Sequence, residues 1–194
     1  KWASGAYARM FHALYQLPVV ILRIFMAYGP AQRDRRKLVP YTILAMLNGE
    51  APQLMSGMRP IDWVYVDDVV EGLLASAQVP RLEGKTIDIG SGRLETVRHV
   101  VEKLARFTGR GITPRFGAKP DRAFEQIRMA DTKAAKELLG WTPRVSLDEG
   151  LRRTVSWYES HAKFREPDRL LRSVRENGTA KMRDLAAENG QPHP

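Results

Sequence analysis

A dense group of basic residues is the first feature of this sequence that could bind a charged ligand. Arg33, Arg35, Arg36 and Lys37 lie within five positions, interrupted by Asp34. Phosphate groups suit such a cluster, because guanidinium groups form charge-assisted, paired hydrogen bonds to them. A solvated loop is nevertheless the favoured interpretation of the cluster, with phosphate binding second and a nucleic-acid contact last. No aromatic residue interleaves with the cluster to stack on bases, which disfavours nucleic acid.

Two adjacent carboxylates, Asp67 and Asp68, are a second candidate, since paired acids can share general acid and base work. They follow a stretch that alternates polar and apolar residues, Asp62 to Val66, and precede an apolar stretch with helical spacing. Acidic residues are favoured at the start of a helix, where they bind free backbone N–H groups. Helix capping is therefore the favoured interpretation of this pair.

The sequence gives less support to a phosphate-binding loop or to a metal site. Gly90-Ser91-Gly92 follows a short apolar run, but the third glycine of a dinucleotide-binding turn is missing, so a structural turn is favoured. The chain has no cysteine, and its histidines share no ligand spacing. We therefore expect no metal site from the four histidines, His12, His99, His161 and His193.

Composition is that of an ordinary globular chain, with 43% hydrophobic and 27% charged residues among 194. The formal charge is +9, mostly as single basic residues scattered among acids. The longest apolar run, Leu17 to Ile24, contains Pro18 and Arg23 and is too short to cross a bilayer. No signal peptide is recognisable, and the absence of cysteine fits a cytoplasmic protein. The chain begins with Lys rather than Met, so we do not expect its first residue to be the start of translation.

Short apolar runs alternate with helical patterns along the chain, which predicts an α/β fold with parallel strand pairing. The expected strands are 19–22, 62–66 and 86–89. The expected helices are 2–15, 41–48 beginning near Pro40, 69–78, 97–108 capped by Thr96, 132–139 and 147–161 beginning near Ser146. From about residue 163 charged and polar residues dominate, which predicts a weakly ordered tail.

Four motifs in register carry a resemblance to a known family. They are Leu22-Arg23-Ile24-Phe25-Met26-Ala27-Tyr28-Gly29-Pro30, Lys37-Leu38-Val39-Pro40, Asp62-Trp63-Val64-Tyr65-Val66-Asp67-Asp68-Val69, and Ala130-Asp131-Thr132-Lys133-Ala134 with Leu139-Gly140-Trp141-Thr142-Pro143. Together they resemble the C-terminal half of extended short-chain dehydrogenases/reductases, the NAD-dependent epimerases and dehydratases of nucleotide sugars. The resemblance implies the C-terminal part of a Rossmann-like, doubly wound parallel sheet plus a smaller substrate-binding α/β subdomain.

The resemblance also implies where the cofactor and the catalytic groups belong. At the family's usual spacing Lys1 falls on the lysine of a Tyr-x-x-x-Lys pair, whose tyrosine would lie four residues before the first residue. An ammonium group there lowers the pKa of the tyrosine and binds the nicotinamide ribose. Phe25, with Met26 beside it, would face the nicotinamide. The cofactor would be NAD or NADP, bound mainly by an N-terminal half whose glycine-rich turn this sequence lacks.

Substrate contacts follow from the same motifs, with two departures. Lys37 and Leu38 belong to a segment that lies over the sugar nucleotide. In the family, an asparagine and an arginine bind the diphosphate at the positions of Met26 and Ile61. Each replacement removes a charge-assisted hydrogen bond and should cost about 1.5–3 kcal/mol of binding free energy. Arg59 can restore part of that interaction, as can Arg35, Arg36 or Lys37. Arg122, or its neighbour Lys119, can supply a second phosphate contact.

These residues predict three segments. Residues 1–30 would end the NAD-binding half, 31–162 would be mostly the substrate-binding region, and 163–194 the charged tail. The expected function is C4 oxidation of a nucleotide sugar by a Tyr-Lys pair, in an epimerase or dehydratase of which this chain is an inactive part. An NAD(P)-dependent reductase of a non-nucleotide carbonyl and a non-catalytic module that binds anions or nucleic acid are the alternatives. We also expect a homodimer through the helix at 2–15, with contacts from Tyr7, Met10, Phe11 and Leu14.

Overall fold

The computed structural model describes residues 2–161, and the side chains of residues 3–161. Lys1 and the tail at 163–194 lie outside the described residues, so the expectations for them are not tested. The order of elements is α1 (Trp2–Tyr15), β1 (Ile21–Ile24), β2 (Met26–Tyr28), α2 (Leu38–Leu47), β3 (Pro60–Tyr65), α3 (Val66–Gln78), β4 (Thr86–Ile89), β5 (Leu94–Thr96), α4 (Val97–Thr108), α5 (Thr132–Leu139) and α6 (Leu147–Ser160). No helix within the described range is long and apolar enough to cross a membrane.

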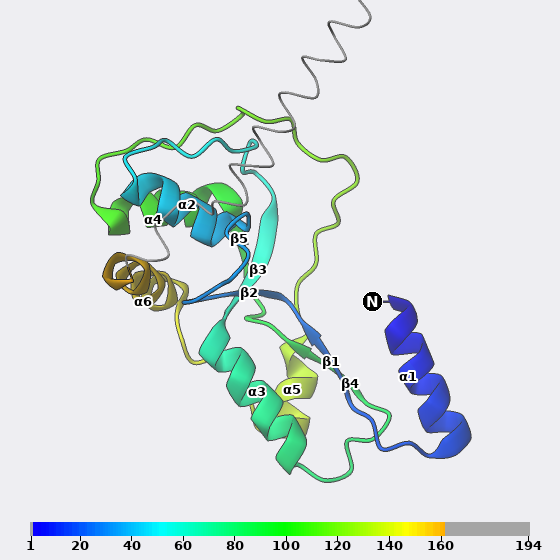
Figure 1. Cartoon of the computed structure of the whole chain (residues 1–194). Helices are drawn as coiled ribbons and strands as arrows, with labels where there is room; N and C mark the ends of the chain where they lie inside the picture. The colour runs from blue at the N-terminus through cyan, green and yellow to red at the C-terminus, as the bar shows by residue number, and fades with distance from the viewer. Residues whose placement is uncertain (1, 162–194) are drawn as a thin grey trace, which may run out of the picture. The chain divides into compact units, whose positions relative to one another are not determined.

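The first sheet is a parallel pair of β1 and β4, in register from Ile21 beside Thr86 to Ile24 beside Ile89. Figure 1 shows α3 and α5 to one side of this pair and α1 to the other. The core on the α3 and α5 side includes Ile87, Ile89 and Trp141, all buried. The parallel pairing of β1 and β4 is the kind that the sequence predicts.

The second sheet orders its strands β2–β3–β5. Strand β2 pairs with β3 in parallel, and β5 joins β3 antiparallel, with Pro60 beside Thr96. Helices α2, α4 and α6 pack on one another around fully buried side chains, among them Ile43, Leu104 and Tyr158. The two sheets and their helices form the α/β architecture that the sequence predicts, and β5 is an additional, antiparallel strand that the sequence did not predict. That strand is only three residues long, too short for a recognisable pattern.

Capping residues set several element boundaries where the sequence places them. The Thr96 hydroxyl accepts a hydrogen bond from the His99 backbone N–H at 3.2 Å, and α4 ends at Gly109 in the left-handed conformation (φ 61°). Asp131 likewise accepts from the Lys133 N–H at 3.0 Å at the start of α5. These local signals fix the two helices as expected.

Other boundaries differ from the prediction. Strand β1 begins at Ile21 rather than at residue 19. Helix α2 begins at Leu38, before Pro40. Proline is tolerated there because it lies in the first turn, where backbone N–H groups have no helical partner. Helix α3 begins at Val66, so Asp67 and Asp68 lie in its first turn and are not its N-cap. The expectation of a side-chain cap there is therefore wrong.

Asp68 has a different partner. Its carboxylate accepts hydrogen bonds from the backbone N–H groups of Arg144 (2.9 Å) and Val145 (3.1 Å), and its carbonyl accepts one from the Trp141 indole at 3.0 Å. The side chain is almost fully buried. Asp68 thus fastens the segment before α6 to α3, which is a structural task and not acid–base chemistry.

Candidate active site

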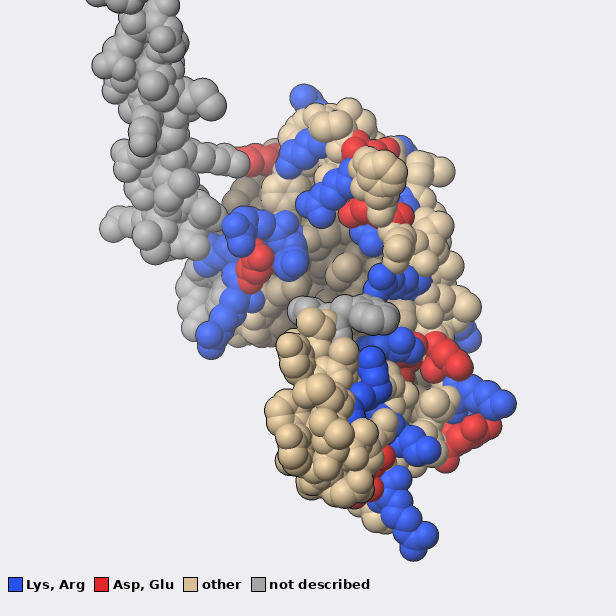
Figure 2. Space-filling view, turned by 90° about the vertical axis from the view of Figure 1, so that its right-hand side faces the viewer, with Lys and Arg blue, Asp and Glu red and all other residues tan. Residues whose placement is uncertain are grey.

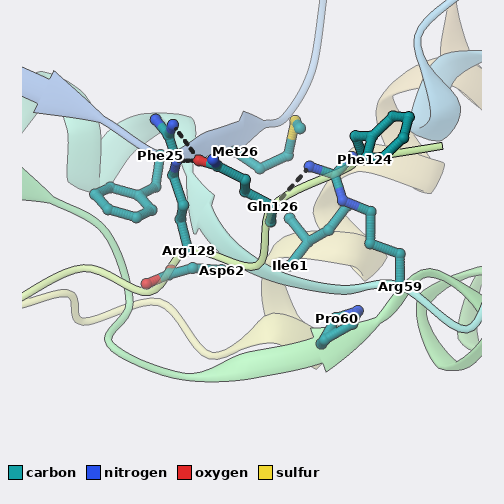
Figure 3. A pocket seen from close by; sticks show the side chains of 9 residues that line it. All are labelled: Phe25, Met26, Arg59, Pro60, Ile61, Asp62, Phe124, Gln126 and Arg128. Carbon is teal, nitrogen blue, oxygen red and sulfur yellow. Dashed lines mark hydrogen bonds between the residues drawn. The ribbon is translucent and has the colours of Figure 1, made fainter. Parts of the chain in front are cut away.

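Two adjoining cavities lie between the ends of the parallel strands and the segment 119–128. The smaller, of about 400 Å³, is lined by Phe25, Met26, Arg59, Pro60, Ile61, Asp62, Phe124, Gln126 and Arg128 (Figure 3). The larger, of about 880 Å³, shares Met26, Arg59, Pro60, Ile61 and Phe124 with it and extends to Lys37, Leu38, Lys119 and Arg122. Both volumes are in the range of small-molecule sites.

Residues predicted from four separate segments meet at these cavities. Phe25 lines the smaller one, and Lys37, Leu38 and Arg122 line the larger one. Met26, Arg59 and Ile61 line both. Lys1 lies outside the described residues, so its placement is not tested.

The larger cavity has a basic lining. The face in Figure 2 is hollowed, with Lys and Arg side chains on either side of the hollow. Among the basic cluster, Arg36 and Lys37 line the larger cavity, whereas Arg33 and Arg35 do not. The Arg36 guanidinium donates to both carboxylate oxygens of Asp34, at 2.9 and 3.3 Å. This hydrogen-bonded pair lowers the pKa of Asp34, so the acid that interrupts the cluster stays ionised and holds Arg36 in place.

A carboxylate that sequence reasoning missed lies between the two predicted phosphate-binding arginines. Glu125 Oε1 is 3.0 Å from Arg59 Nη1 and 3.7 Å from Arg122 Nη1. Arg59 also donates from Nη2 to the Gln126 carbonyl at 3.5 Å, while its buried Nε has no hydrogen-bond partner among the described residues. The arginine is therefore held at the cavity wall with part of its donor capacity unused.

The wall shared by the two cavities carries the two departures from the family pattern. Met26 begins β2 and pairs in register with Trp63, and Ile61 lies in β3, the strand beside β2. Both side chains line both cavities. An apolar side chain donates no hydrogen bond, so anion binding at this wall depends on Arg59 and the residues around it.

Phe25 lies directly after β1, at the carboxyl end of a parallel strand. Its backbone N–H donates to the Ile89 carbonyl at 3.0 Å, so β1 and β4 remain joined up to this point. The half-buried side chain lines the smaller cavity. Ligands of open α/β sheets bind beyond the carboxyl ends of strands, and Phe25 occupies that position.

The turn Gly90-Ser91-Gly92 already holds an anion, the carboxylate of Asp62. Asp62 Oδ1 accepts from the Ser91 N–H and hydroxyl, both at 2.7 Å, and Oδ2 accepts from the Gly92 N–H (3.0 Å) and the Ala130 N–H (2.9 Å). A Cβ at Gly90 would lie 2.5 Å from the Ala130 Cβ, so glycine is required there by close approach. The turn is structural, as expected, and offers these donors to no ligand phosphate.

The buried Tyr28 is not a candidate base. Tyr28 lines the larger cavity and donates from Oη to the Leu147 carbonyl at 3.3 Å. Burial raises the pKa of Tyr28 above the ordinary tyrosine value, and the nearby Tyr65 and Asp68 add to the shift. Tyr28 is therefore a neutral hydrogen-bond donor at neutral pH.

Residues 2–161 contain no group of three or more His, Cys, Asp or Glu side chains that could hold a metal ion.

Sequence reasoning missed Phe124, Gln126 and Arg128. Phe124 is fully exposed and has a left-handed backbone (φ 61°), which phenylalanine rarely adopts. The segment has no periodic pattern and no regular element in the structure. The only signal was its composition, since aromatic, amide and guanidinium groups between Arg122 and Ala130 are suited to ligand contact.

Comparison with known proteins gives a consistent result. A model of the family described as GDP-mannose 4,6 dehydratase matches residues 1–154. The chain is 31% identical over 150 residues to a UDP-glucuronate 4-epimerase of Thermodesulfobacterium geofontis, covering 76% of this chain and 45% of that protein. It is 31% identical over 169 residues to a dTDP-glucose 4,6-dehydratase of Xanthomonas campestris, covering 81% and 47%.

Solved structures are similar over the same range. A UDP-glucose 4-epimerase from Thermotoga maritima with UDP-glucose superposes with a TM-score of 0.76 at 33% identity, over 84% of this chain and 52% of that one. A UDP-glucuronic acid 4-epimerase from Bacillus cereus in complex with UDP-glucuronic acid and NAD gives 0.75 at 27% identity, over 82% and 51%. The chain thus spans about half the length of the relatives it matches.

Proposed function

We propose a function from the premise that this chain belongs to the GDP-mannose 4,6-dehydratase family of NAD-dependent epimerases and dehydratases. The chain forms the substrate side of an enzyme that oxidises C4 of a nucleotide sugar. One observation carries the proposal. The seven described residues chosen from sequence motifs, from Phe25 to Arg122, line two adjoining cavities although they come from four segments. Surface residues chosen without a shared function would not converge in this way.

The larger cavity is the proposed site of the nucleoside diphosphate. Lys37, Arg59 and Arg122 bring positive charge to it, and Leu38 adds apolar surface. The phosphates would replace Glu125 as the anionic partner of Arg59 and Arg122. With Met26 and Ile61 in place of two donors, Arg59 carries more of the diphosphate contact than in relatives that have the asparagine and arginine.

The cofactor would meet this chain at Phe25. NAD, when bound, would supply the acceptor for the hydride from C4 of the sugar. Phe25 is suited to pack on the nicotinamide, because it lies beyond the carboxyl end of β1 and lines the smaller cavity. Asp62 occupies the donors of the glycine turn, so residues 2–161 are suited to hold the nicotinamide end and not the pyrophosphate. Lys1 is proposed to stabilise the phenolate of a tyrosine that removes the sugar hydroxyl proton.

The 194 residues include neither the tyrosine that would pair with Lys1 nor the glycine-rich turn that would bind the cofactor. We therefore propose that this polypeptide alone does not turn over substrate and that it acts together with a cofactor-binding half. Cofactor choice between NAD and NADP rests with that half.

A second candidate function is an NAD(P)-dependent reductase of a carbonyl compound without a nucleotide. The apolar Met26 and Ile61 at the shared wall favour it, because a substrate without phosphates needs no donors there. The basic lining of the larger cavity favours the nucleotide sugar instead.

A homodimer through α1 is also proposed. The apolar side chains Tyr7, Met10, Phe11 and Leu14 recur at helical spacing and are all exposed. Exposed apolar surface of this kind marks an interaction site in a soluble enzyme.

Ligand-dependent melting tests the proposed function. The 194-residue chain would be heated with NAD, UDP-glucose or dTDP-glucose, because ligands that bind only the folded state raise the melting temperature. We expect a rise with a nucleotide sugar and little with NAD. Arg59→Gln should reduce the rise, whereas Arg110→Gln, an exposed position that lines neither cavity, should not. If neither nucleotide sugar raises the melting temperature, the proposed substrate class is wrong.

A further inference from the structure

The smaller cavity contains an arginine that the diphosphate does not require. Arg128 lines this cavity but not the larger one, whereas Arg59 lines both. Figure 3 shows the Arg128 side chain at the Phe25 end and Arg59 with Phe124 at the other end. The two guanidinium groups therefore serve different parts of any ligand that extends through both cavities.

The end beside Phe25 is the end for the sugar. This step rests on the proposed function: a hydride moves directly from the sugar carbon to the nicotinamide, so the sugar must lie beside the cofactor. The larger cavity, with Lys37, Lys119 and Arg122, then takes the nucleoside diphosphate. Arg128 would consequently face the hexose.

The three charged side chains of the smaller cavity, Arg59, Asp62 and Arg128, differ in their partners. Arg59 is paired with Glu125 at 3.0 Å. Asp62 is almost fully buried, and its carboxylate accepts four hydrogen bonds from the 91–92 turn and Ala130. Arg128 contacts a neutral group: its Nε and Nη2 donate to the amide oxygen of Gln126 at 3.2 and 2.6 Å.

Gln126 positions the arginine without neutralising it. A guanidinium has five N–H donors, and the bonds to Gln126 use two of them. Within residues 2–161, Arg128 has no carboxylate within salt-bridge distance. A planar group with a full charge and unused donors is suited to a carboxylate, which it binds through paired, charge-assisted hydrogen bonds.

We propose that Arg128, oriented by Gln126, selects a sugar that bears a carboxylate, so that the substrate is a nucleoside-diphosphate hexuronate and not a neutral hexose. A 4,6-dehydratase expels the C6 hydroxyl as water, and a uronate has a carboxylate at C6 instead. The assignment therefore excludes 4,6-dehydration. It leaves two reactions that begin with oxidation at C4: epimerisation, or loss of the C6 carboxylate as carbon dioxide from the β-keto acid that this oxidation forms.

Calorimetric titration of the 194-residue chain with UDP-glucuronate, UDP-glucose and UDP tests this assignment. The two sugar nucleotides differ only at C6, so the ratio of their dissociation constants isolates the carboxylate. We expect UDP-glucuronate to bind about tenfold more tightly, the order of one charge-assisted contact. Arg128→Gln should bring the ratio close to one and leave UDP affinity unchanged. Arg128→Lys should give an intermediate ratio, and Arg110→Gln should keep the wild-type ratio.

The outcomes separate this inference from the proposed function. Equal affinity of the unaltered chain for the two sugar nucleotides would overturn the role of Arg128 and leave the nucleotide-sugar site standing. A preference for UDP-glucuronate that survives Arg128→Gln would also overturn it. Absence of binding by all three nucleotides would overturn the proposed function and this inference with it. Melting temperatures without ligand would show whether Arg128→Gln alters the fold.

Discussion

The guanidinium of Arg59 lies 3.0 Å from the carboxylate of Glu125 at the wall that the two cavities share. The same carboxylate is 3.7 Å from Arg122, so one acid is the ionic partner of both arginines proposed to bind phosphates. A diphosphate entering the larger cavity must compete with Glu125 for them. The acid therefore lowers affinity for any anion while it keeps the two arginines in position before a ligand arrives.

Glu125→Gln removes this competition and should strengthen binding of UDP. Partly exposed ion pairs contribute roughly 0.2–1 kcal/mol each, so we expect the dissociation constant to fall about two- to fivefold. Titration calorimetry at low ionic strength would measure it. Glu137→Gln is the matched control, because Glu137 forms an exposed pair with Lys133 on α5 and lines neither cavity. Weaker binding by Glu125→Gln would mean that the carboxylate holds the site together instead of competing for it.

The Asp62 carboxylate should be among the most sensitive positions for stability. In Asp62→Asn one oxygen becomes an NH₂ group, which would face N–H donors such as those of Gly92 and Ala130 in a fully buried place. We expect a loss of about 3 kcal/mol in the free energy of unfolding. Urea denaturation would measure it.

Asp131→Asn makes the same chemical change at an exposed N-cap, where asparagine serves as well as aspartate. Its effect should be close to zero. A loss below about 1 kcal/mol in Asp62→Asn would show that the 91–92 turn does not depend on a charged acceptor.

The Lys103–Asp148 pair, which joins α4 to α6, predicts a pH dependence of stability. The two groups are 2.7 Å apart, and this hydrogen bond lowers the pKa of Asp148 below its ordinary value. The folded state then binds fewer protons than the unfolded state. The pair stabilises the fold above the ordinary aspartate pKa of about 3.9 and loses this contribution as the pH falls through the folded-state pKa.

Asp148→Asn should therefore lower the free energy of unfolding near pH 6 and have little effect near pH 2. Asp148 is half exposed, so solvent screening limits the change at pH 6 to a few tenths of a kcal/mol, up to about 1. Urea denaturation at both pH values would measure it, and in a Lys103→Gln background the effect should vanish. An equal loss at both pH values would assign the effect to packing instead of charge.

Much of the fold could be predicted because local signals and tertiary packing agree. Thr86–Ile89 is a strand in which three of four residues are β-branched, and glycine follows it. Thr96 and Asp131 cap the helices that follow them. The family itself was predicted from four motifs and is confirmed by the comparisons. Position 68 shows the limit: neighbouring residues predict a helix cap, but the partners of Asp68 are 76 and 77 residues away in the sequence.

The site was predicted where motifs cover it and missed where they do not. Arg59 and Arg122 were chosen from sequence, yet the carboxylate that joins them was not, because Glu125 lies in a segment with no periodic pattern. The backbone conformation of Phe124 and the contact between Gln126 and Arg128 depend on how that segment folds across the cavity. Such contacts arise from tertiary structure, and residue types alone do not specify them.

The exposed face of α1 gives the last prediction, on self-association. Tyr7, Met10, Phe11 and Leu14 form one apolar row, with exposed fractions between 42% and 65%. If this row is the dimer contact, Phe11→Glu would bury a charge against a second copy. We expect the dimer dissociation constant to rise on the order of tenfold or more in sedimentation equilibrium. Ala13→Glu adds the same charge on α1 outside the row and should leave association unchanged. A chain that is monomeric at high concentration before any substitution would contradict the α1 interface directly.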